Sequence, residues 1–363
     1  MIHYLICCKD NPSSAACNRV KLFVKGFNAV GYNCTVHFLD LNSNRFTKFW
    51  KFLEHYIGVF FLATKMSKKD VLIIYGETPL VYLYGYIARR TNLIIEKTEF
   101  PLYLIIKDLP SRSFTYWQSV KNLDYYCKAG AMVTCSTALE RYLKQFNNNI
   151  FISPLIVNLD EFANASDQKK PINDKYIAYC GSLNNNKDGV PTLIRSFAIF
   201  HERYRDIKLV IIGAGSKESL IELNQLIEQH GLTDSIIFTG AIPHSEMAKW
   251  LNNAIMLALA RPNNKQAEGG MPSKVGEYLA TGVPCVITNV GDLHLYMKDG
   301  RDCYMAQPDS VESFAQKMIQ CYTSDNTRLV ENAKKLAIQF NYDYQAELFG
   351  EYIKQRFPEF VKE

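Results

Sequence analysis

The chain alternates short apolar runs of strand length with amphipathic helical patterns, and this alternation limits its fold more than any other feature. Residues 2–8 (IHYLICC) and 34–39 are two such runs, and a helical pattern over 19–30 that stops at Gly31 lies between them. A strand, a helix and a second strand at this spacing predict a βαβ unit with a parallel sheet.

The same rhythm continues to the end of the chain, interrupted by a polar stretch at 164–175 (NASDQKKPINDK) that is typical of a linker. Further strand patterns fall at 71–75, 93–97, 132–135, 150–153, 176–180, 208–212, 236–239, 256–260 and 285–288. They predict an α/β protein with two doubly wound, Rossmann-like sheets. The expected domains are an N-terminal one at 1–165, a C-terminal one at 166–340, and a final aromatic-rich helix at 341–363 that crosses back to the N-terminal domain.

Composition agrees with a globular protein and excludes several other classes. A chain of 363 residues is too long for one ordinary core. Its net charge of +5 is too small to mark a nucleic-acid binder. The ten cysteines show no zinc-like spacing, so we expect no metal site and reduced, buried thiols. No signal peptide or apolar run of membrane-spanning length is visible, so a cytoplasmic location is expected.

The segment 44–69 stands apart because its aromatic and aliphatic residues recur at helical spacing between basic flanks. Phe46, Phe49, Trp50, Leu53, Ile57, Phe60 and Phe61 fall on one predicted helical face. One interpretation is a helix that packs this face on the core. The other is an interfacial helix that lies on an anionic membrane, which would make the protein peripheral on the inner face of the cell membrane.

The stretch 268–292 (EGGMPSKVGEYLATGVPCVITNVGD) has the composition of an anion site in a parallel sheet. A glycine pair and a proline turn precede a helix, whose first backbone N–H groups attract negative charge. Glu277 follows within the helix, where a carboxylate would repel a phosphate but accept hydrogen bonds from sugar hydroxyls. Phosphate at the helix start and hydroxyls further in describe a nucleotide or a nucleotide-sugar.

Several other predicted strands of the second half end in small or charged residues. The loop 181–189 (GSLNNNKDG) could wrap a diphosphate with its backbone and Lys187, and Arg261 follows a buried strand directly. Lys274 opposes the dipole in the first turn of its helix, which an anion would explain. Because ligands of doubly wound sheets bind beyond the carboxyl ends of the strands, these loops predict one shared rim.

The segments GSLNNNKDGVPTLIRSFAIF, LVIIGAG, IIFTGAIPHSEM and GGMPSKVGEYLATGVPCVIT occur in this order and resemble the retaining family 4 glycosyltransferases of GT-B fold. The resemblance spans about 176–322, is weaker before it, and is closest to capsule- and O-antigen-type members. It implies two Rossmann-like domains facing across a cleft, a nucleotide-diphospho-sugar in the C-terminal domain and no metal. Lys187, Arg261 and Lys274 would stabilise the leaving diphosphate. The donor-binding residues so implied are Gly181, Ser182, Gly213, Gly240, Ile242, Glu268, Gly269, Gly270, Met271, Pro272, Ser273 and Glu277.

The chain departs from the family pattern at three places. Glu268 and Glu277 are one residue further apart than the family's paired glutamates, so Gly269 stands in the register of the first one. Ser182 replaces an arginine of the diphosphate loop, and Lys187 is shifted by one position. These differences leave the fold unaffected but put the donor contacts in question.

The N-terminal half is expected to hold the acceptor. Where the family has a glycine-rich loop after the first strand, this chain has the small residues Ser13 and Ser14. Glu77 and Glu99 follow predicted strands, and Glu99 is the candidate for a catalytic polar group. A helix-capping or surface carboxylate is the alternative for each.

The leading hypothesis is a metal-independent, hexosyltransferase-type retaining glycosyltransferase of surface polysaccharide synthesis, such as that of lipopolysaccharide or capsule. It would move a sugar to a lipid-linked or glycan acceptor. The alternatives are a sugar-nucleotide epimerase of similar shape and a catalytically impaired nucleotide-sugar- or glycan-binding protein.

Overall fold

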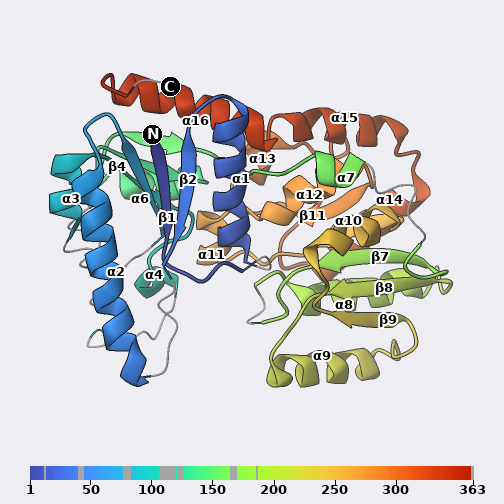
Figure 1. Ribbon diagram of the computed structural model, residues 1–363. Coiled ribbons are helices and arrows are strands. Elements are labelled where there is room, and N and C mark those ends of the chain that lie inside the picture. The colour runs from blue at the N-terminus through green and yellow to red at the C-terminus, as the bar shows by residue number, and fades with distance from the viewer. Residues whose placement is uncertain are drawn as a thin grey trace. The chain divides into compact units, whose positions relative to one another are not determined.

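The computed structural model describes residues 1–11, 14–39, 45–76, 83–105, 111, 116, 120, 126–163, 170–184 and 187–360. The chain divides into two compact units. Unit 1 comprises Met1–Ile156, Gly269–Met271 and Asn341–Glu363, and unit 2 comprises Val157–Glu268 and Pro272–Phe340. Each unit contains one parallel sheet flanked by helices (Figure 1).

Unit 1 is built on a six-stranded sheet in the order β2-β1-β3-β4-β5-β6. Every neighbouring pair of its strands is parallel. The strands are β1 (Ile2–Ile6), β2 (Cys34–Phe38), β3 (Val71–Tyr75), β4 (Asn92–Lys97), β5 (Ala131–Thr134) and β6 (Ile150–Ile152). Because β1 lies between β2 and β3, the chain reverses its winding there, as doubly wound sheets do.

Alternating side chains place a separate apolar layer on each face of this sheet. Tyr4 and Ile6 pack on one face with α1 (Ala15–Ala29) and α16 (Tyr342–Arg356). Leu5 and Leu72 pack on the other face. The helices on that side are α2 (Arg45–Lys65), α3 (Tyr84–Arg90) and α6 (Thr137–Leu143), and a short α4 (Leu102–Ile105) follows β4.

The C-terminal helix α16 lies against α1 within unit 1 (Figure 1). The two backbones approach so closely at Gly26 that a Cβ atom there would collide with the carbonyl oxygen of Tyr342 and with Ala346. Phe349 fills the space between α1 and the sheet through ring contacts with Phe23 and Phe151. The last helix therefore completes the core of the first unit.

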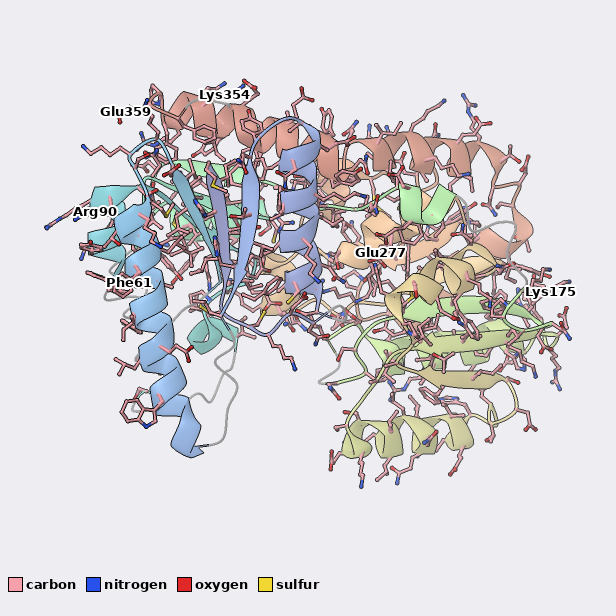
Figure 2. The ribbon with its side chains drawn as sticks, in the orientation of Figure 1. Phe61, Arg90, Lys175, Glu277, Lys354 and Glu359 are labelled. Atoms are coloured by element: carbon pink, nitrogen blue, oxygen red, sulfur yellow. The ribbon has the colours of Figure 1, made fainter. Side chains whose placement is uncertain are left out.

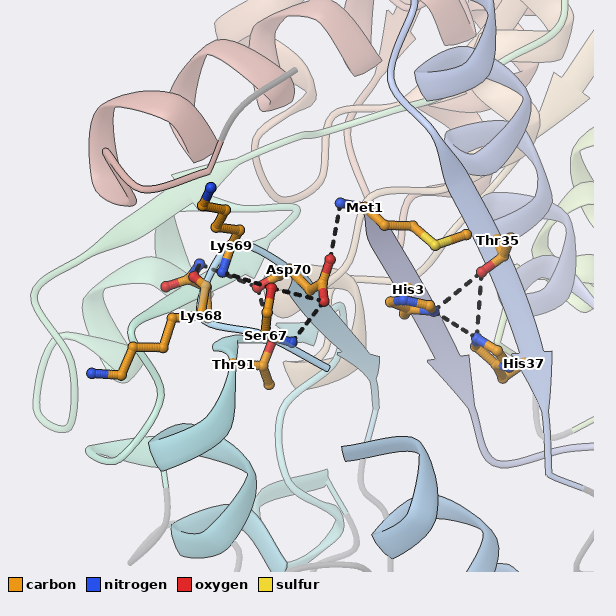
Figure 3. A network of polar contacts seen from close by, with 10 residues as sticks. Met1, His3, Thr35, His37, Ser67, Lys68, Lys69, Asp70 and Thr91 are labelled. Atoms are coloured by element: carbon orange, nitrogen blue, oxygen red, sulfur yellow. Dashed lines mark hydrogen bonds and ion pairs between the residues drawn. The ribbon is translucent and has the colours of Figure 1, made fainter. Parts of the chain in front are cut away.

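A polar network ties the beginnings of the strands of unit 1 together (Figure 3). Asp70 accepts a hydrogen bond from the amino group of Met1 at 3.1 Å and from the backbone N–H of Ser67 at 2.7 Å. His3 and His37 stack on the neighbouring strands β1 and β2, with 3.0 Å between their ring nitrogens. Burial lowers the pKa of both histidines. The turn before β3 is thus held at the N-terminal edge of the sheet.

Unit 2 contains the second parallel sheet, in the order β12-β11-β10-β7-β8-β9. Its strands are β7 (Lys175–Cys180), β8 (Ile207–Ile212), β9 (Ile236–Gly240), β10 (Met256–Leu259), β11 (Cys285–Thr288) and β12 (Tyr304–Ala306). The helices are α7 (Asp160–Ala163), α8 (Val190–His201), α9 (Lys217–Gln229), α10 (His244–Asn252), α11 (Lys265–Gly269), α12 (Ser273–Thr281), α13 (Leu293–Tyr296), α14 (Val311–Thr323) and α15 (Thr327–Ile338).

The predicted fold class, two doubly wound α/β sheets, is confirmed by these topologies. The sequence pattern did not indicate β12, because three residues at an edge give too little periodicity. All ten cysteines are free thiols. Among the described residues, no helix is both long enough and apolar enough to cross a bilayer.

Candidate functional site

The loops beyond β7, β8 and β9 are bound to one another through their backbones. The N–H of Gly181 donates to the carbonyl of Ile212 at 2.8 Å, and the N–H of Gly213 donates to that of Gly240 at 3.0 Å. Leu183 makes a similar bond to Ala214. The carboxyl ends of three strands therefore form one continuous rim in unit 2, as the sequence predicted.

Two glycines let these loops pass within backbone contact. Gly213 has φ of +146°, and a side chain there would collide with the carbonyl oxygen of Gly181. Gly181 has φ of +155°, and its Cβ would collide with the Tyr179 hydroxyl. Only glycine meets both the conformational and the steric requirement. The two glycines are therefore required for the loops of the rim to pack against one another and against Tyr179.

The floor below Gly181 holds a buried ion pair that the sequence did not reveal. Lys274 Nζ lies 2.6 Å from Oδ2 of Asp188, whose side chain is only 2% exposed. The Tyr179 hydroxyl donates to the same oxygen at 3.0 Å. Burial alone would raise the pKa of Asp188, but Lys274 and Arg261 outweigh it and hold this pKa below its usual value. Lys274 therefore needs no bound anion to explain its place in the first turn of α12, because Asp188 neutralises its charge.

Two helices that begin at this rim have no side-chain cap. Helix α8 starts after Gly189 and α12 starts after Pro272, and neither preceding side chain accepts a hydrogen bond from its helix. Of the other helices of unit 2, α9 and α14 have a serine cap, whereas α10, α13 and α15 also lack a side-chain cap. Uncapped N–H groups at a helix start attract an anion through their donors and the helix dipole. The starts of α8 and α12 can therefore serve a diphosphate.

Glu277 lies one turn into α12 and is half-buried (Figure 2). Burial raises its pKa, whereas His244 and Lys274 lower it in part. His244 begins α10 and pairs with Glu161 of α7, with 3.1 Å between Nε2 and Oε2. The hydrogen bond to Glu161 raises the pKa of His244. A carboxylate held in this setting accepts hydrogen bonds from neutral hydroxyls better than it tolerates an anion.

The other two predicted cations also lie in the rim loops of unit 2. Arg261 follows β10 and is only 4% exposed, so it does not belong to a surface salt bridge. Its guanidinium donates weakly to the carbonyl of Gln266, at 3.4 Å, and its own carbonyl accepts from Thr288. Lys187 is half-buried directly before Asp188. Both residues stand in loops that follow strand carboxyl ends.

The first residues of the predicted donor motif, Glu268 and Gly269, stand shortly before α12 in the chain. Glu268 is exposed and pairs with Lys265 at 2.8 Å. Gly269 packs within unit 1, where a Cβ would collide with the ring of Phe100, and its carbonyl accepts from Ser136 Oγ at 2.7 Å. A glutamate cannot fit at Gly269 unless Phe100 moves.

The remaining predicted donor residues are distributed between the two units. Gly270 and Met271 belong to unit 1, and Ser182, Ile242, Pro272 and Ser273 belong to unit 2. Ser182 is exposed, and its hydroxyl accepts from Asn184 N–H at 3.3 Å. The binding roles of all these residues stay predictions.

On the acceptor side, Ser13 and Glu77 lie outside the described residues. Ser14 caps α1 by accepting from Cys17 N–H, which gives it a structural role. Glu99 is half-buried just beyond β4. Its neighbour Glu96 is fully buried, accepts from the hydroxyl of Tyr4, and pairs with Arg19 at 2.6 Å. Glu96 anchors the sheet to α1, so the buried carboxylate of this segment is structural.

The sequence did not single out Asp188, Glu161, His244 or Glu96. Asp188 is an acidic residue in a loop that otherwise has the composition of a phosphate-binding loop. It is separated from Lys274 by 86 residues along the chain. A pairing over such a separation gives no local pattern. His244 does occupy the first position of α10 in the segment GAIPHSEM, and that position was the available signal. In the described part of the chain, no three histidine, cysteine or acidic side chains gather as metal ligands would.

Residues 174–324 match the family described as "Glycosyl transferases group 1". This match covers most of unit 2 and includes the strand-end glycines, Lys274 and Glu277. The family match therefore indicates a glycosyltransferase domain in the second half of the chain, and the rim of unit 2 lies within the matched residues.

Among curated proteins, the chain is 25% identical over 183 residues to a D-inositol 3-phosphate glycosyltransferase of Corynebacterium urealyticum. It is 27% identical over 177 residues to the protein of the same name from Paenarthrobacter aurescens. Each alignment covers 48% of this chain, and they cover 42% and 40% of the relatives. The matched part thus spans less than half the length of either protein.

Solved structures resemble the chain over nearly its whole length. Sucrose-phosphate synthase of Thermosynechococcus elongatus has a TM-score of 0.76 at 15% identity, over 98% of this chain and 99% of that one. An Anabaena protein in complex with UDP and glucose has a TM-score of 0.74 at 13% identity, over 98% and 100%. The fold is that of the GT-B glycosyltransferases, with two Rossmann-like α/β domains.

Proposed function

We propose that the protein is a retaining glycosyltransferase that moves a hexose from a UDP-sugar to a lipid-linked or glycan acceptor. The observation that carries this proposal is the rim of unit 2, where α8 and α12 begin without side-chain caps and α12 carries Glu277. The solved structures that share the fold support the choice of UDP, because one contains UDP and glucose and another, from E. coli, contains UDP-2-fluoro glucose.

In the proposed site, the diphosphate lies on the backbone N–H groups at the two helix starts, with Arg261 and Lys187 supplying charge. Asp188 cancels the charge of Lys274 at 2.6 Å, so Lys274 contributes less than its position suggested. Glu277 accepts hydrogen bonds from the ribose hydroxyls. The backbone N–H groups and the two cations stabilise the negative charge that develops on the leaving diphosphate. No metal or cofactor is needed in this scheme.

The chemical step needs no nucleophile from the protein. The acceptor hydroxyl attacks the anomeric carbon on the face from which the diphosphate departs. The bond from that carbon to the phosphate oxygen breaks, and a phosphate oxygen takes the proton of the hydroxyl. Glu99, half-buried beyond β4, is the proposed polar group on the acceptor side.

The direct test is to incubate the protein with UDP-glucose and UDP-N-acetylglucosamine and to measure released UDP with and without glycan and lipid-linked acceptors. Glu277→Ala should lower the affinity for UDP by on the order of 10- to 100-fold, as expected for a lost hydrogen bond to a charged group. Glu228→Ala on α9 is the matched control, since Glu228 is exposed on another helix. Equal UDP affinity in the wild type and Glu277→Ala would remove Glu277 from the site.

The same assays separate the two alternatives. A binding protein without activity would bind UDP-sugars but release no UDP. The observation that favours this alternative is that Phe100 leaves no space for a glutamate side chain at Gly269. An epimerase would return an epimeric sugar from the donor alone. The pair of His244 and Glu161, 3.1 Å apart, is the acid–base group available for that chemistry.

The proposed setting is the cytoplasmic face of the membrane, in the synthesis of a surface polysaccharide such as capsule or lipopolysaccharide. We assign the membrane contact to an α2 stripe, defined as Trp50, Leu53, Ile57, Phe60 and Phe61. These five side chains are between 40% and 68% exposed, and Trp50 is the most exposed. The core is instead contacted by Val59 and Ala63 of α2 and by Met66, which directly follows it. The interpretation as core-facing is therefore wrong for these five side chains, whereas those of Phe46 and Phe49 lie outside the described residues.

Helix α2 is thus apolar on both sides, and the outer side lies in solvent next to basic residues. A surface helix of this kind inserts its apolar side chains into the headgroup region of an anionic bilayer. Phe61→Glu with Trp50→Glu should abolish sedimentation with anionic vesicles, whereas Lys217→Glu with Lys249→Glu on α9 and α10 should not. Sedimentation that is the same for both double variants would rule out the stripe as the contact.

A further inference from the structure

Unit 1 contains a cavity of about 320 Å³ at the N-terminal edge of its sheet, away from the strand ends that hold ligands in this fold. It is lined by the turn before β3, by the end of α3 and by the residues that follow α16. Thr91 and Asn92 form its polar wall directly before β4. The cavity is therefore a separate feature from the catalytic end of the sheet.

Three of the lining side chains are cations, namely Lys68, Arg89 and Arg356, and one is an acid, Glu359. Within the described residues, no carboxylate forms a salt bridge with any of the three cations. Lys69 and Arg90 follow Lys68 and Arg89 directly in the sequence, Lys65 lies three residues before Lys68, and all three are exposed. Figure 2 shows Arg90 and Glu359 on this side of unit 1.

The cations are held in place by the fold. Asn92 Nδ2 donates to the carbonyl of Lys68 at 2.6 Å, and Thr91 Oγ1 donates to that of Asp70 at 2.8 Å. These bonds fix the turn that carries Lys68, whose side chain points away from the network in Figure 3. Arg356 Nε donates to the carbonyl of Gly130 at 2.8 Å. The backbone at Lys68 and the guanidinium of Arg356 are thus fixed, while the side chains of Lys68, Arg89 and Arg356 are all exposed at the mouth of the cavity.

An alternative explanation is that these cations only offset helix dipoles, because α2, α3 and α16 all end with basic residues here. Each helix end contributes about half a negative charge. Three ends and Glu359 together offset roughly 2.5 positive charges, which nearly balances the three lining cations and leaves Lys65, Lys69 and Arg90 as the surplus. A positive surplus remains around one cavity, and it suits an anionic group such as a phosphate.

Ring contacts link the α2 stripe to helix α3, whose end lines the cavity. Phe60 of the stripe stacks on Tyr86 of α3 with ring centroids 4.9 Å apart. The guanidinium of Arg90 covers the same Tyr86 ring at 5.3 Å, and Arg89 lines the cavity. Apolar side chains that enter a bilayer beside a pocket for phosphate fit one kind of ligand, a phospholipid with an anionic headgroup.

We infer that the cavity lined by Lys68, Arg89 and Arg356 binds the phosphate of an anionic phospholipid headgroup while the α2 stripe enters the bilayer. This inference rests on the membrane attachment proposed above. It adds a defined lipid site at the end of the sheet opposite to the acceptor side. That site would orient unit 1 on the membrane in addition to holding it there.

The test compares sedimentation with phosphatidylcholine vesicles that contain or lack phosphatidylglycerol. The double variant Arg89→Gln/Arg356→Gln should bind the anionic vesicles roughly 30-fold more weakly, since each cation near such a surface is worth about a factor of five. Glu359→Gln should bind them more tightly, because it removes the acid of the cavity. Arg328→Gln/Lys335→Gln on α15 has the same charge change as the double variant and should bind like the wild type.

The outcomes separate this inference from the proposals on which it depends. If the wild type binds anionic vesicles but the cavity and α15 variants weaken binding equally, general charge explains the binding and the cavity is not a lipid site. If inorganic phosphate raises the melting temperature of the wild type alone and vesicle binding is unchanged in the cavity variant, the ligand is free phosphate. If the wild type binds no vesicles, the membrane proposal fails as well. UDP affinity should be equal in all variants, which also shows that they are folded.

Discussion

At the scale of single residues, the candidate site combines a few charges whose roles depend on their partners. Lys274 and Glu277 lie on the same helix start, yet Lys274 is neutralised by Asp188 whereas Glu277 is held in a setting that raises its pKa. A stretch of sequence that looks strongly charged therefore presents little net charge to a ligand. In the proposed site, the attraction for a diphosphate would therefore come mainly from backbone donors, Arg261 and Lys187.

The ion pair of Asp188 and Lys274 provides the first prediction. Lys274→Met would leave the carboxylate of Asp188 buried without its cation, and should destabilise the protein by about 3–5 kcal/mol. Adding Asp188→Asn should recover much of this loss, because the uncompensated charge is then removed. Thermal unfolding of the two variants and the wild type measures both effects. A double variant no more stable than Lys274→Met would contradict this explanation.

The same pair gives the protein a defined sensitivity to acid. The pKa of Asp188 is lower in the folded protein than its usual value of 3.8. The pair therefore contributes stability that is fully present above that value and is lost as the pH falls through the folded pKa. The acid unfolding of Asp188→Asn/Lys274→Met should lack this contribution, and melting temperatures between pH 5 and pH 2 would show a shallower slope than in the wild type.

At the scale of elements, the docking of α16 on α1 determines how the chain closes unit 1. The contact at Gly26 leaves no space for a methyl group against Tyr342 and Ala346. Tyr32 makes a similarly close contact with Gly350 of α16. Helix α2 differs, since Gly58 lies on its exposed side with open space around it.

These two glycines make a matched pair of predictions. Gly26→Ala should destabilise the protein by about 1–3 kcal/mol, because α16 must shift to admit the methyl group. Gly58→Ala should leave stability unchanged or raise it by up to about 1 kcal/mol, since alanine favours a helix interior and meets no neighbour. Denaturant unfolding compares them. Equal effects of both substitutions would mean that α16 is not tightly docked on α1.

At the scale of the whole molecule, unit 2 is expected to bind the nucleotide and unit 1 the acceptor. Hydrogen exchange can test where the nucleotide binds. Saturating UDP should slow amide exchange in residues 181–189, 213–216 and 273–278 by roughly 100-fold if UDP is present at about 100 times its dissociation constant. The turn 67–70 and the start of β4 at the opposite sheet edge of unit 1 should not respond. Unchanged exchange in the three segments of unit 2 would locate the nucleotide elsewhere.

The sequence by itself determined the fold class and the rim of unit 2. Buried strands that alternate with helices allow little besides a doubly wound sheet, and in such a sheet the strand ends converge. Glycines 181, 213 and 240 therefore had to meet, and they do. The family resemblance of residues 174–324 was also readable, because the motifs are contiguous in the chain.

Only the tertiary structure decided which charges face each other and which apolar faces are covered. Asp188 and Lys274 are 86 residues apart, and Phe100 reaches Gly269 across a larger separation, so neither contact has a local pattern. The two sides of α2 are both apolar in sequence, and packing alone selects Val59 and Ala63 for the core and leaves Trp50 exposed. The physical reason is that periodicity reports which residues share a face, whereas burial depends on what the rest of the chain brings against that face.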